Sequence, residues 1–297
     1  MKLLHLPTTP ILKSLPPGFQ HIHGHTIHVA KIPGKDPNGY TIAFIHGIAA
    51  SGSTWLPVIW HMMPVAAKFL IFDMPAHGLS PDPRPPFTCL DAYACVKECL
   101  QTNLTKGAKN LIVGNSLGGS FALKFAIECP EYVSLCALIS PAGAPFPVSA
   151  HAVIDRFLPH TLAQANKIID DVWIRPTLGA RMIAPLLLHT ALQPGFISLM
   201  KSITDIDDNP DSPLSDDLFS PEKLRNFNIP ACLVWGDLDR ILPREMRDYY
   251  DKYLPKSVAR IFPDDFGHSP QLDTPKRLAH ILLKWLEQTS SEHDKNH

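Results

Sequence analysis

The sequence has 297 residues, of which 45% are hydrophobic and 19% charged, and its formal net charge is −1 at pH 7. This length permits one large domain or a domain with an insertion, and the composition supplies ample apolar side chains for a packed core. The small net charge argues against a nucleic-acid or anionic-membrane footprint.

Both the N-terminus and the cysteines indicate a reducing compartment. The apolar run Leu3–Pro7 is too short for a signal peptide, and no stretch approaches 18 uncharged apolar residues, so we expect no membrane span. The six cysteines form no C-x-x-C pair, which predicts neither a disulfide framework nor a zinc site. We therefore expect a cytoplasmic protein without a metal or cofactor, and the sequence leaves its oligomeric state open.

Residues 18–31 alternate in character and predict a β-hairpin. His21, His23 and His25 alternate within it, an arrangement that raises the question of a metal site on one strand face. No carboxylate or cysteine interleaves with them, and Gly24 indicates a turn inside the run, so we expect no metal there.

Short, continuously apolar runs follow along the chain, and each is typical of a strand buried on both faces, as in a parallel sheet covered by helices. They are residues 40–45, 69–73, 111–113, 134–140, 231–235 and 259–262. Helical patterns lie between them, at residues 90–102, at 120–129 and from Thr274-Pro275 onward. This alternation predicts an α/β fold with a mostly parallel sheet. The polar stretch Ser290–His297 predicts a disordered tail.

The alternation stops between about Pro145 and Leu224, where helical patterns at residues 151–158, 162–173 and 178–192 are broken by prolines. We interpret residues 145–224 as a helical cap inserted over the carboxyl edge of the sheet, and residues 1–144 and 225–297 as the core. A helical subdomain away from the site is the alternative. Several apolar cap residues are candidates either for an acyl pocket or for the cap's own core: Leu186, Leu187, Leu188, Phe196, Leu199 and Met200.

The motif Gly114-Asn115-Ser116-Leu117-Gly118 stands between an apolar strand pattern and a helical one. A G-x-S-x-G sequence in the context strand–turn–helix predicts a nucleophile elbow, in which the serine hydroxyl is exposed above the sheet. A serine hydroxyl needs a base to become nucleophilic, and the base is expected to be a histidine oriented by a carboxylate. Downstream, Trp235-Gly236-Asp237-Leu238-Asp239 and Gly267-His268 each follow an apolar strand.

The chain resembles the α/β-hydrolase-fold serine hydrolases over nearly its full length. The resemblance rests on five motifs in the expected order: His46-Gly47-Ile48, Asp73-Met74-Pro75-Ala76-His77-Gly78-Leu79-Ser80, the elbow, Trp235–Asp239 and Gly267-His268. It implies a triad of Ser116, Asp239 and His268, with Asp237 as the rival acid. It also implies structural roles for His46, His77 and Asp73.

An acyl-transfer site also needs donors for the oxyanion of the tetrahedral intermediate. We expect one from the backbone N–H of Leu117, which follows the nucleophile, and the second from Ile48 in the loop after the His46-Gly47 strand. Ala49 is the alternative for the second donor.

The leading functional hypothesis is a serine hydrolase that cleaves a small-molecule carboxylic ester through an acyl-enzyme intermediate. Carbon–carbon bond hydrolases have similar Gly-Asn-Ser elbows, but they typically carry tryptophan directly after the histidine, where this chain has Ser269. Acyltransferases share the triad. A ligand-binding receptor or pseudoenzyme of the same fold is the hypothesis from outside the enzymes.

Overall fold

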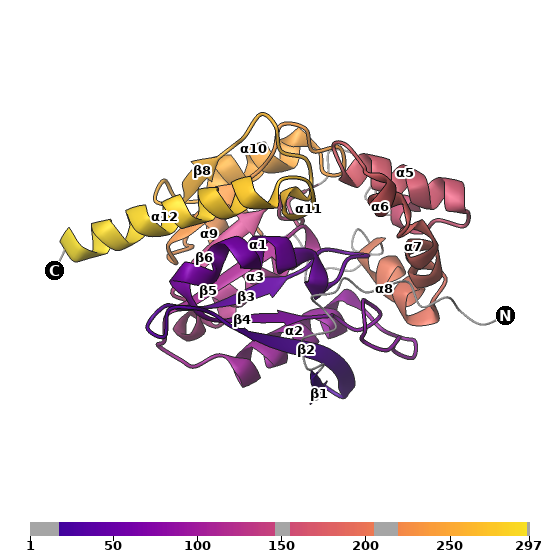
Figure 1. The fold of residues 1–297 in the computed structure, drawn as a ribbon, viewed down its shortest axis with the longest axis horizontal. Helices are drawn as coiled ribbons and strands as arrows, with labels where there is room; N and C mark the ends of the chain where they lie inside the picture. Colours follow the sequence, from indigo (N-terminus) through magenta and orange to yellow (C-terminus); the bar gives the residue numbers. More distant parts are fainter. Residues whose placement is uncertain (1–17, 146–154, 205–218, 296–297) are drawn as a thin grey trace.

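The computed structural model describes residues 18–145, 155–204 and 219–295, and its centre is an eight-stranded sheet in the order β1-β2-β4-β3-β5-β6-β7-β8 (Figure 1). The first two strands form the predicted antiparallel hairpin, with its turn at Gly24, and β2 pairs antiparallel with β4. All other pairs are parallel, so the predicted α/β class is confirmed. The strands are β1 (Gly18–Ile22), β2 (His25–Pro33), β3 (Tyr40–Ile45), β4 (Ala66–Phe72), β5 (Asn110–Asn115), β6 (Leu135–Ile139), β7 (Ala231–Val234) and β8 (Ala259–Ile261).

Helices cover both faces of this sheet, and successive side chains of its central strands alternate between them. Ile42 and Phe44 of β3 pack into the cluster formed with α1 (Leu56–Met62) and α12 (Pro275–Lys295). Ala43 and Ile45 pack into the cluster on the opposite face. That face is covered by α2 (Cys89–Asn103), α3 (Leu117–Glu128), α9 (Pro221–Arg225) and α10 (Arg244–Tyr253). Burial on both faces explains why the strands appear as continuous apolar runs.

Local signals determine where two of these helices begin. Thr88 caps α2 in a reciprocal pair with Asp91, whose carboxylate accepts the backbone N–H of Thr88. The start of α3 differs from the prediction: the helix begins at Leu117 rather than Ser120, because Ser116 itself is its N-cap residue. Gly118 and Gly119 have low helix propensity, so the sequence pattern predicted a later start, but they do not prevent the helix from forming.

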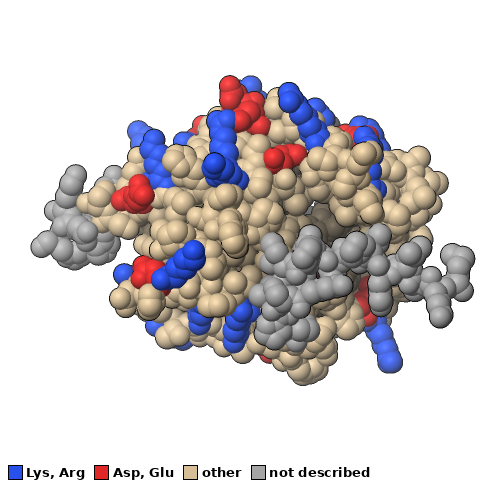
Figure 2. Space-filling model, in the orientation of Figure 1, with Lys and Arg blue, Asp and Glu red and all other residues tan. Residues whose placement is uncertain are grey.

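Between β6 and β7 the chain forms the helices that we call the cap helices: α5 (Leu162–Val172), α6 (Leu178–Arg181), α7 (Ala184–Ala191) and α8 (Pro194–Thr204). They gather at one end of the molecule (Figure 1). In the same orientation, the space-filling view shows a hollow in the surface beside them (Figure 2). A 3₁₀ turn, Asp155–Phe157, precedes them, while residues 151–154 of the expected first helix lie outside the described residues. The boundary placed at Leu224 falls inside α9, which packs against α10.

The predicted disordered tail is wrong as far as Lys295, because α12 continues to that residue. Side chains support this extension by bonding back to the helix: Thr289 Oγ1 donates to Trp285 O at 2.9 Å and Ser291 Oγ donates to Gln288 O at 2.8 Å. Two further elements complete the list, η2 (Gly52–Trp55) before α1 and α11 (Pro270–Asp273) before α12.

Within the described ranges, no single helix has the length and apolar composition needed to cross a bilayer. Two stretches, Leu178–Ala191 and Pro194–Ile203, meet that test only when taken together, and they are bent by 84°.

Candidate active site

Ser116 lies at the sharp turn between β5 and α3, with φ 56° and ψ −122°. A positive φ is strained for a residue with a side chain, and the surrounding backbone holds it in place. Its N–H donates to Ile139 O at 3.0 Å, and its carbonyl accepts the N–H of Gly119 at 2.9 Å and of Ala142 at 3.1 Å. This is the geometry that the elbow motif predicts.

The motif glycines allow this turn to form against its neighbours. A Cβ on Gly114 would lie 2.1 Å from Gly118 O, and a Cβ on Gly118 would lie 2.4 Å from the backbone oxygens of His46 and Ile45. Neither position can hold a side chain without moving the backbone. The spacing of glycine and serine is therefore a packing requirement of the turn.

His268 and Asp239 form a buried pair at the ends of two neighbouring strands. His268 Nδ1 lies 2.9 Å from Asp239 Oδ2, and the other carboxylate oxygen, Oδ1, accepts the N–H groups of Ile241 at 2.9 Å and Leu242 at 3.0 Å. These donors fix the carboxylate, which in turn favours the tautomer of His268 with its proton on Nδ1. The Nε2 lone pair is then left to act as a base.

The rival acid, Asp237, points elsewhere. Its Oδ1 lies 2.5 Å from Arg247 Nη1, and its side chain is 45% exposed. Asp265, close to His268 in sequence, pairs with Arg277 of α12. Of these carboxylates, only Asp239 bonds the histidine.

Asn115 links the serine turn to the histidine loop, a role that sequence reasoning missed. Its Nδ2 donates to His268 O at 2.9 Å and to Ile139 O at 3.1 Å, while its Oδ1 accepts Gln271 Nε2 at 2.8 Å. All of these side chains are buried. Asn115, the residue before Ser116, therefore holds the loop that carries His268. No pattern in the sequence marks Gln271, because its partner is 156 residues away.

The two expected oxyanion donors lie on either side of the elbow. Leu117 is the first residue of α3, so its N–H has no acceptor within the helix. The loop after β3 crosses directly over Ser116: a Cβ on Gly47 would lie 3.1 Å from Ser116 Cβ. Ile48 follows at this crossing, and Ala49 next to it has φ 56°. The loop after β3 is therefore close enough to Ser116 to supply the second N–H donor for the oxyanion. The assignment of that donor to Ile48 stays a prediction.

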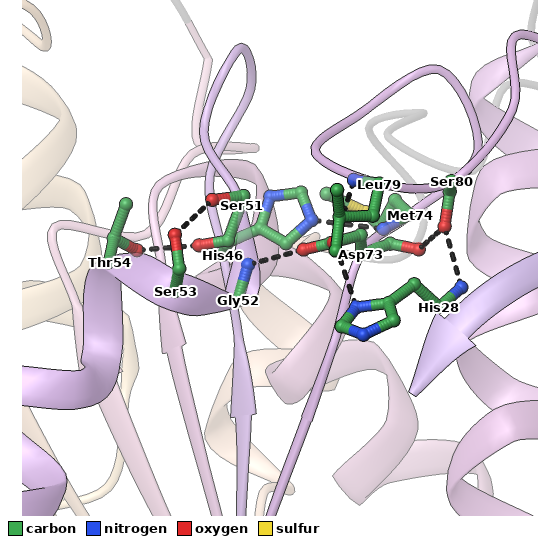
Figure 3. Close-up of polar contacts among 10 residues, drawn as sticks. All are labelled: His28, His46, Ser51, Gly52, Ser53, Thr54, Asp73, Met74, Leu79 and Ser80. Carbon is green, nitrogen blue, oxygen red and sulfur yellow. Dashed lines mark hydrogen bonds and ion pairs between the residues drawn. The ribbon is translucent and has the colours of Figure 1, made fainter. Parts of the chain in front are cut away.

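A buried network fixes that loop against the loop after β4 (Figure 3). His46 Nδ1 donates to Gly47 O at 2.8 Å, and His46 Nε2 accepts the N–H of Met74 at 3.0 Å. Asp73 Oδ1 accepts the N–H of Gly52 at 2.7 Å, and its Oδ2 lies 3.1 Å from His28 Nδ1. Two loops that follow adjacent strands are thus joined, which makes the backbone over Ser116 rigid.

The charges in this network follow from burial and hydrogen bonding. Burial lowers the pKa of His46, so its imidazole is neutral. Burial would raise the pKa of Asp73, but the hydrogen bonds from His28, Leu79 and Gly52 outweigh it and hold this pKa below its ordinary value. Burial, with His46 nearby, lowers the pKa of His77 to about 3. His46 and His77 are neutral structural side chains here.

Hydrogen bonds join the cap region to the loops around this site at several places. Asp82 accepts the N–H groups of Gly195 at 2.9 Å and Phe196 at 3.1 Å, and the Phe196 ring packs against His77. The N–H of Ile174, which follows α5, donates to Asp273 at 3.2 Å. Arg240, beside Asp239, donates to Asp170 O at 3.0 Å.

The apolar cap residues divide into two sets. Phe196, Leu199 and Met200 of α8 are fully buried in the core cluster, whereas Leu186 of α7 is half-exposed to solvent. The three α8 residues therefore belong to the core, and Leu187 and Leu188 of α7 pack, partly buried, against the cluster around Ala165 and Ile169. For metals, no group of three or more His, Cys, Asp or Glu side chains in the described ranges is arranged to hold an ion.

Curated relatives resemble the chain at low identity. An uncharacterized protein of Mycobacterium tuberculosis is 27% identical over 310 residues, covering 96% of this chain and 86% of that protein. A 2-hydroxymuconate semialdehyde hydrolase of Pseudomonas putida is 28% identical over 61% of this chain and 64% of that enzyme. A monoacylglycerol lipase of Xenopus laevis is 23% identical over 89% of this chain and 80% of that enzyme.

Solved structures share the fold. A bacterial membrane phospholipase A has a TM-score of 0.77 at 19% identity, covering 93% of this chain and 87% of that one. A meta-cleavage product hydrolase from Pseudomonas fluorescens has a TM-score of 0.73 at 17% identity, covering 92% and 98%. The family model for the alpha/beta hydrolase family matches residues 42–281, a range that contains Ser116, Asp239 and His268. The chain is therefore a member of the alpha/beta hydrolase family, with the fold of its hydrolases.

Proposed function

We propose that the protein is a serine hydrolase that cleaves carboxylic esters through an acyl-enzyme, with Ser116 as nucleophile, His268 as base and Asp239 as the orienting acid. The observation that carries the proposal is the 2.9 Å bond between His268 Nδ1 and Asp239 Oδ2 in a loop that Asn115 ties to the serine turn. A buried carboxylate–histidine pair, whose loop is bonded to the strained turn that carries a serine, supports acyl transfer by that serine.

In this mechanism Ser116 Oγ attacks the ester carbonyl carbon and gives its proton to His268 Nε2. The oxyanion is stabilised by the N–H groups of Leu117 and Ile48. The intermediate then collapses, and the alcohol leaves with the proton from His268. Water, deprotonated by His268, attacks the acyl-enzyme and releases the acid. Asp239 orients the imidazole of His268 and stabilises the imidazolium when it forms.

A carbon–carbon bond hydrolase is the second candidate. The Gly-Asn-Ser elbow and the similarity to the semialdehyde hydrolase of Pseudomonas putida favour it. Against it, Ser269 occupies the place where such enzymes typically carry tryptophan, and its hydroxyl is buried, 3.4 Å from Asn115 Oδ1. The similarity to a monoacylglycerol lipase favours ester cleavage.

The test is a substrate panel with an active-site probe. We expect turnover of p-nitrophenyl esters from acetate to laurate, labelling by a fluorophosphonate, and loss of both in Ser116→Ala. A ring-cleavage diketone is assayed in parallel, and faster turnover of the diketone than of every ester would select the second candidate. Added alcohols test acyl transfer by competing with water. Absence of labelling and of all turnover would favour the receptor hypothesis.

A further inference from the structure

The loop that follows β6 lies directly against the turn of Ser116. The N–H of Ala142 in this loop donates to Ser116 O at 3.1 Å, and Ile139 O at the end of β6 accepts the N–H of Ser116 at 3.0 Å. The packing here is close, since a Cβ on Gly119 would lie 2.9 Å from Pro141 Cα. Both backbone groups of the serine are therefore bonded to the end of β6 and to the loop after it.

The backbone of this loop is strained. Ser140, its first residue, has φ 39°, a value that residues with a side chain rarely adopt. A strained backbone persists only where the surrounding groups hold it in place. The groups that hold this loop therefore bear on the elbow, because the bond from Ala142 transmits any movement of the loop to Ser116.

Two hydroxyl groups hold the loop at Ala142 O. Tyr250 Oη donates to this carbonyl at 2.6 Å and Ser120 Oγ donates to it at 2.7 Å. Both side chains are fully buried, and burial raises the pKa of the Tyr250 phenol well above its ordinary value, so the phenol stays protonated and donates. Ser120 lies in the first turn of α3, and Tyr250 lies on α10, the helix that follows the loop of Asp239. Ala142 O is thus the point at which these two helices are joined.

We propose that Tyr250 and Ser120 are positioning residues for the nucleophile: their hydroxyls hold Ala142, and Ala142 holds Ser116 in the orientation from which it attacks. This inference rests on the proposed function, in which both residues act through Ala142. Because the loop is strained and Ser116 itself has φ 56°, removal of a hydroxyl lets the backbone relax. A small displacement of the nucleophile then lowers the rate of the chemical step more than it weakens substrate binding.

The test compares Tyr250→Phe with Tyr249→Phe, a matched control on the same helix. Tyr249 Oη donates to a different backbone carbonyl, Phe219 O, at 2.8 Å. Each variant therefore removes one hydroxyl that bonds a carbonyl, and we expect both to lower Tm by a few degrees. On a p-nitrophenyl ester, Tyr250→Phe is expected to lower kcat about tenfold with KM nearly unchanged, whereas Tyr249→Phe keeps both constants. The pH profile of kcat should keep its midpoint, because the pair of His268 and Asp239 is not altered.

Ser120 provides a second, independent variant. We expect Ser120→Ala to lower kcat several-fold and Ser120→Ala/Tyr250→Phe, which removes both hydroxyls from Ala142 O, to lower it about a hundredfold. Labelling by a fluorophosphonate distinguishes a misplaced nucleophile from partial unfolding. A misplaced Ser116 reacts with a smaller rate constant, but every chain is labelled in the end, whereas partial unfolding lowers the fraction of chains that become labelled.

The proposal is overturned if Tyr249→Phe loses as much kcat as Tyr250→Phe, or if the effect of Tyr250→Phe is confined to KM. It is also overturned if a smaller labelled fraction accounts for the loss of kcat. In each of these cases the proposed function stands, because the parent protein still turns over the ester and reacts with the probe. Failure of the parent protein in both assays would instead overturn the proposed function, and the positioning role with it.

Discussion

Asp237 and Asp239 lie two residues apart in one loop, and their different hydrogen-bond partners predict different roles. Asp239 accepts two backbone N–H groups and bonds His268, while Asp237 bonds the buried Arg247. We expect Asp239→Asn to lower kcat about 10³- to 10⁴-fold with a small change in Tm, because the amide disfavours the productive tautomer. Asp237→Asn should keep kcat and lower Tm, because it weakens the partner of a buried cation. Measurements of kcat on an ester and of Tm for both variants test this assignment. A large loss of kcat in Asp237→Asn, with kcat kept in Asp239→Asn, would make Asp237 the acid.

Asn115 is the second residue whose role can be isolated. Asn115→Ala removes the donor to His268 O, and we expect kcat to fall about ten- to a hundredfold with KM nearly unchanged, because the base loses its position. Asn115→Asp should be worse in both kcat and Tm, since a buried carboxylate would face the carbonyls of His268 and Ile139. Equal kcat in the parent and alanine variants would show that the loop is held without this bond.

At the scale of elements, Asp273 of α11 joins the histidine loop to the end of α5. Burial raises the pKa of Asp273 to about 6, although the bond from Ile174 and the nearby Arg240 act to lower it. The folded protein therefore binds this proton more tightly than the unfolded chain does between about pH 6 and 3.8. The stability that this group contributes rises as the pH falls through that window.

Asp273→Asn, which does not titrate, lacks this dependence. We expect urea unfolding to show the variant at its greatest advantage over the parent protein at pH 7.5, and this advantage to shrink at pH 4.5. The difference between the free energies of unfolding of the two proteins at each pH excludes the contributions of the other titrating groups, because both proteins share those groups. An advantage that grows towards low pH would mean that the carboxylate form is the one that the fold favours.

The elements that sequence reasoning predicted well are those with a local cause. Buried strands appear as apolar runs, and Gly114 of the elbow is required by a contact with Gly118, four residues along the chain. What it missed depends on distant partners. Asn115 and Gln271 meet across 156 residues, and the burial of Phe196 but not Leu186 depends on how α7 and α8 pack on the core. The start of α3 at Leu117 was missed because the strained turn overrides the low helix propensity of glycine.

At the scale of the whole molecule, the strand order brings the ends of β5, β7 and β8, which are followed by Ser116, Asp239 and His268, to one edge of the sheet. Sequence predicted these three loops and their order along the chain. It did not predict that the cap would be joined to the loops of Asp239 and His268, through Arg240 and Asp273, because hydrogen bonds to backbone groups leave no residue pattern in the cap. The position of the cap helices relative to the sheet is set by side-chain packing between distant segments, which a local sequence pattern does not encode.

The six cysteines report on the integrity of this whole structure, because all are free and buried in it. Five of them lie in the core clusters on the two faces of the sheet, and Cys95 is buried on α2. Burial raises the pKa of Cys89 and Cys99 to about 12, which suppresses the reactive thiolate. We expect Ellman's reagent at pH 8 to label the native protein at least roughly 10³-fold more slowly than the protein in guanidinium, where all six thiols react. Labelling then requires opening of the core, so its rate should rise in parallel with the unfolded fraction as urea is added.

Cys129→Ser is the control for local fraying at the end of α3. Rapid labelling of the native protein that this variant does not abolish would show that a core face opens without global unfolding.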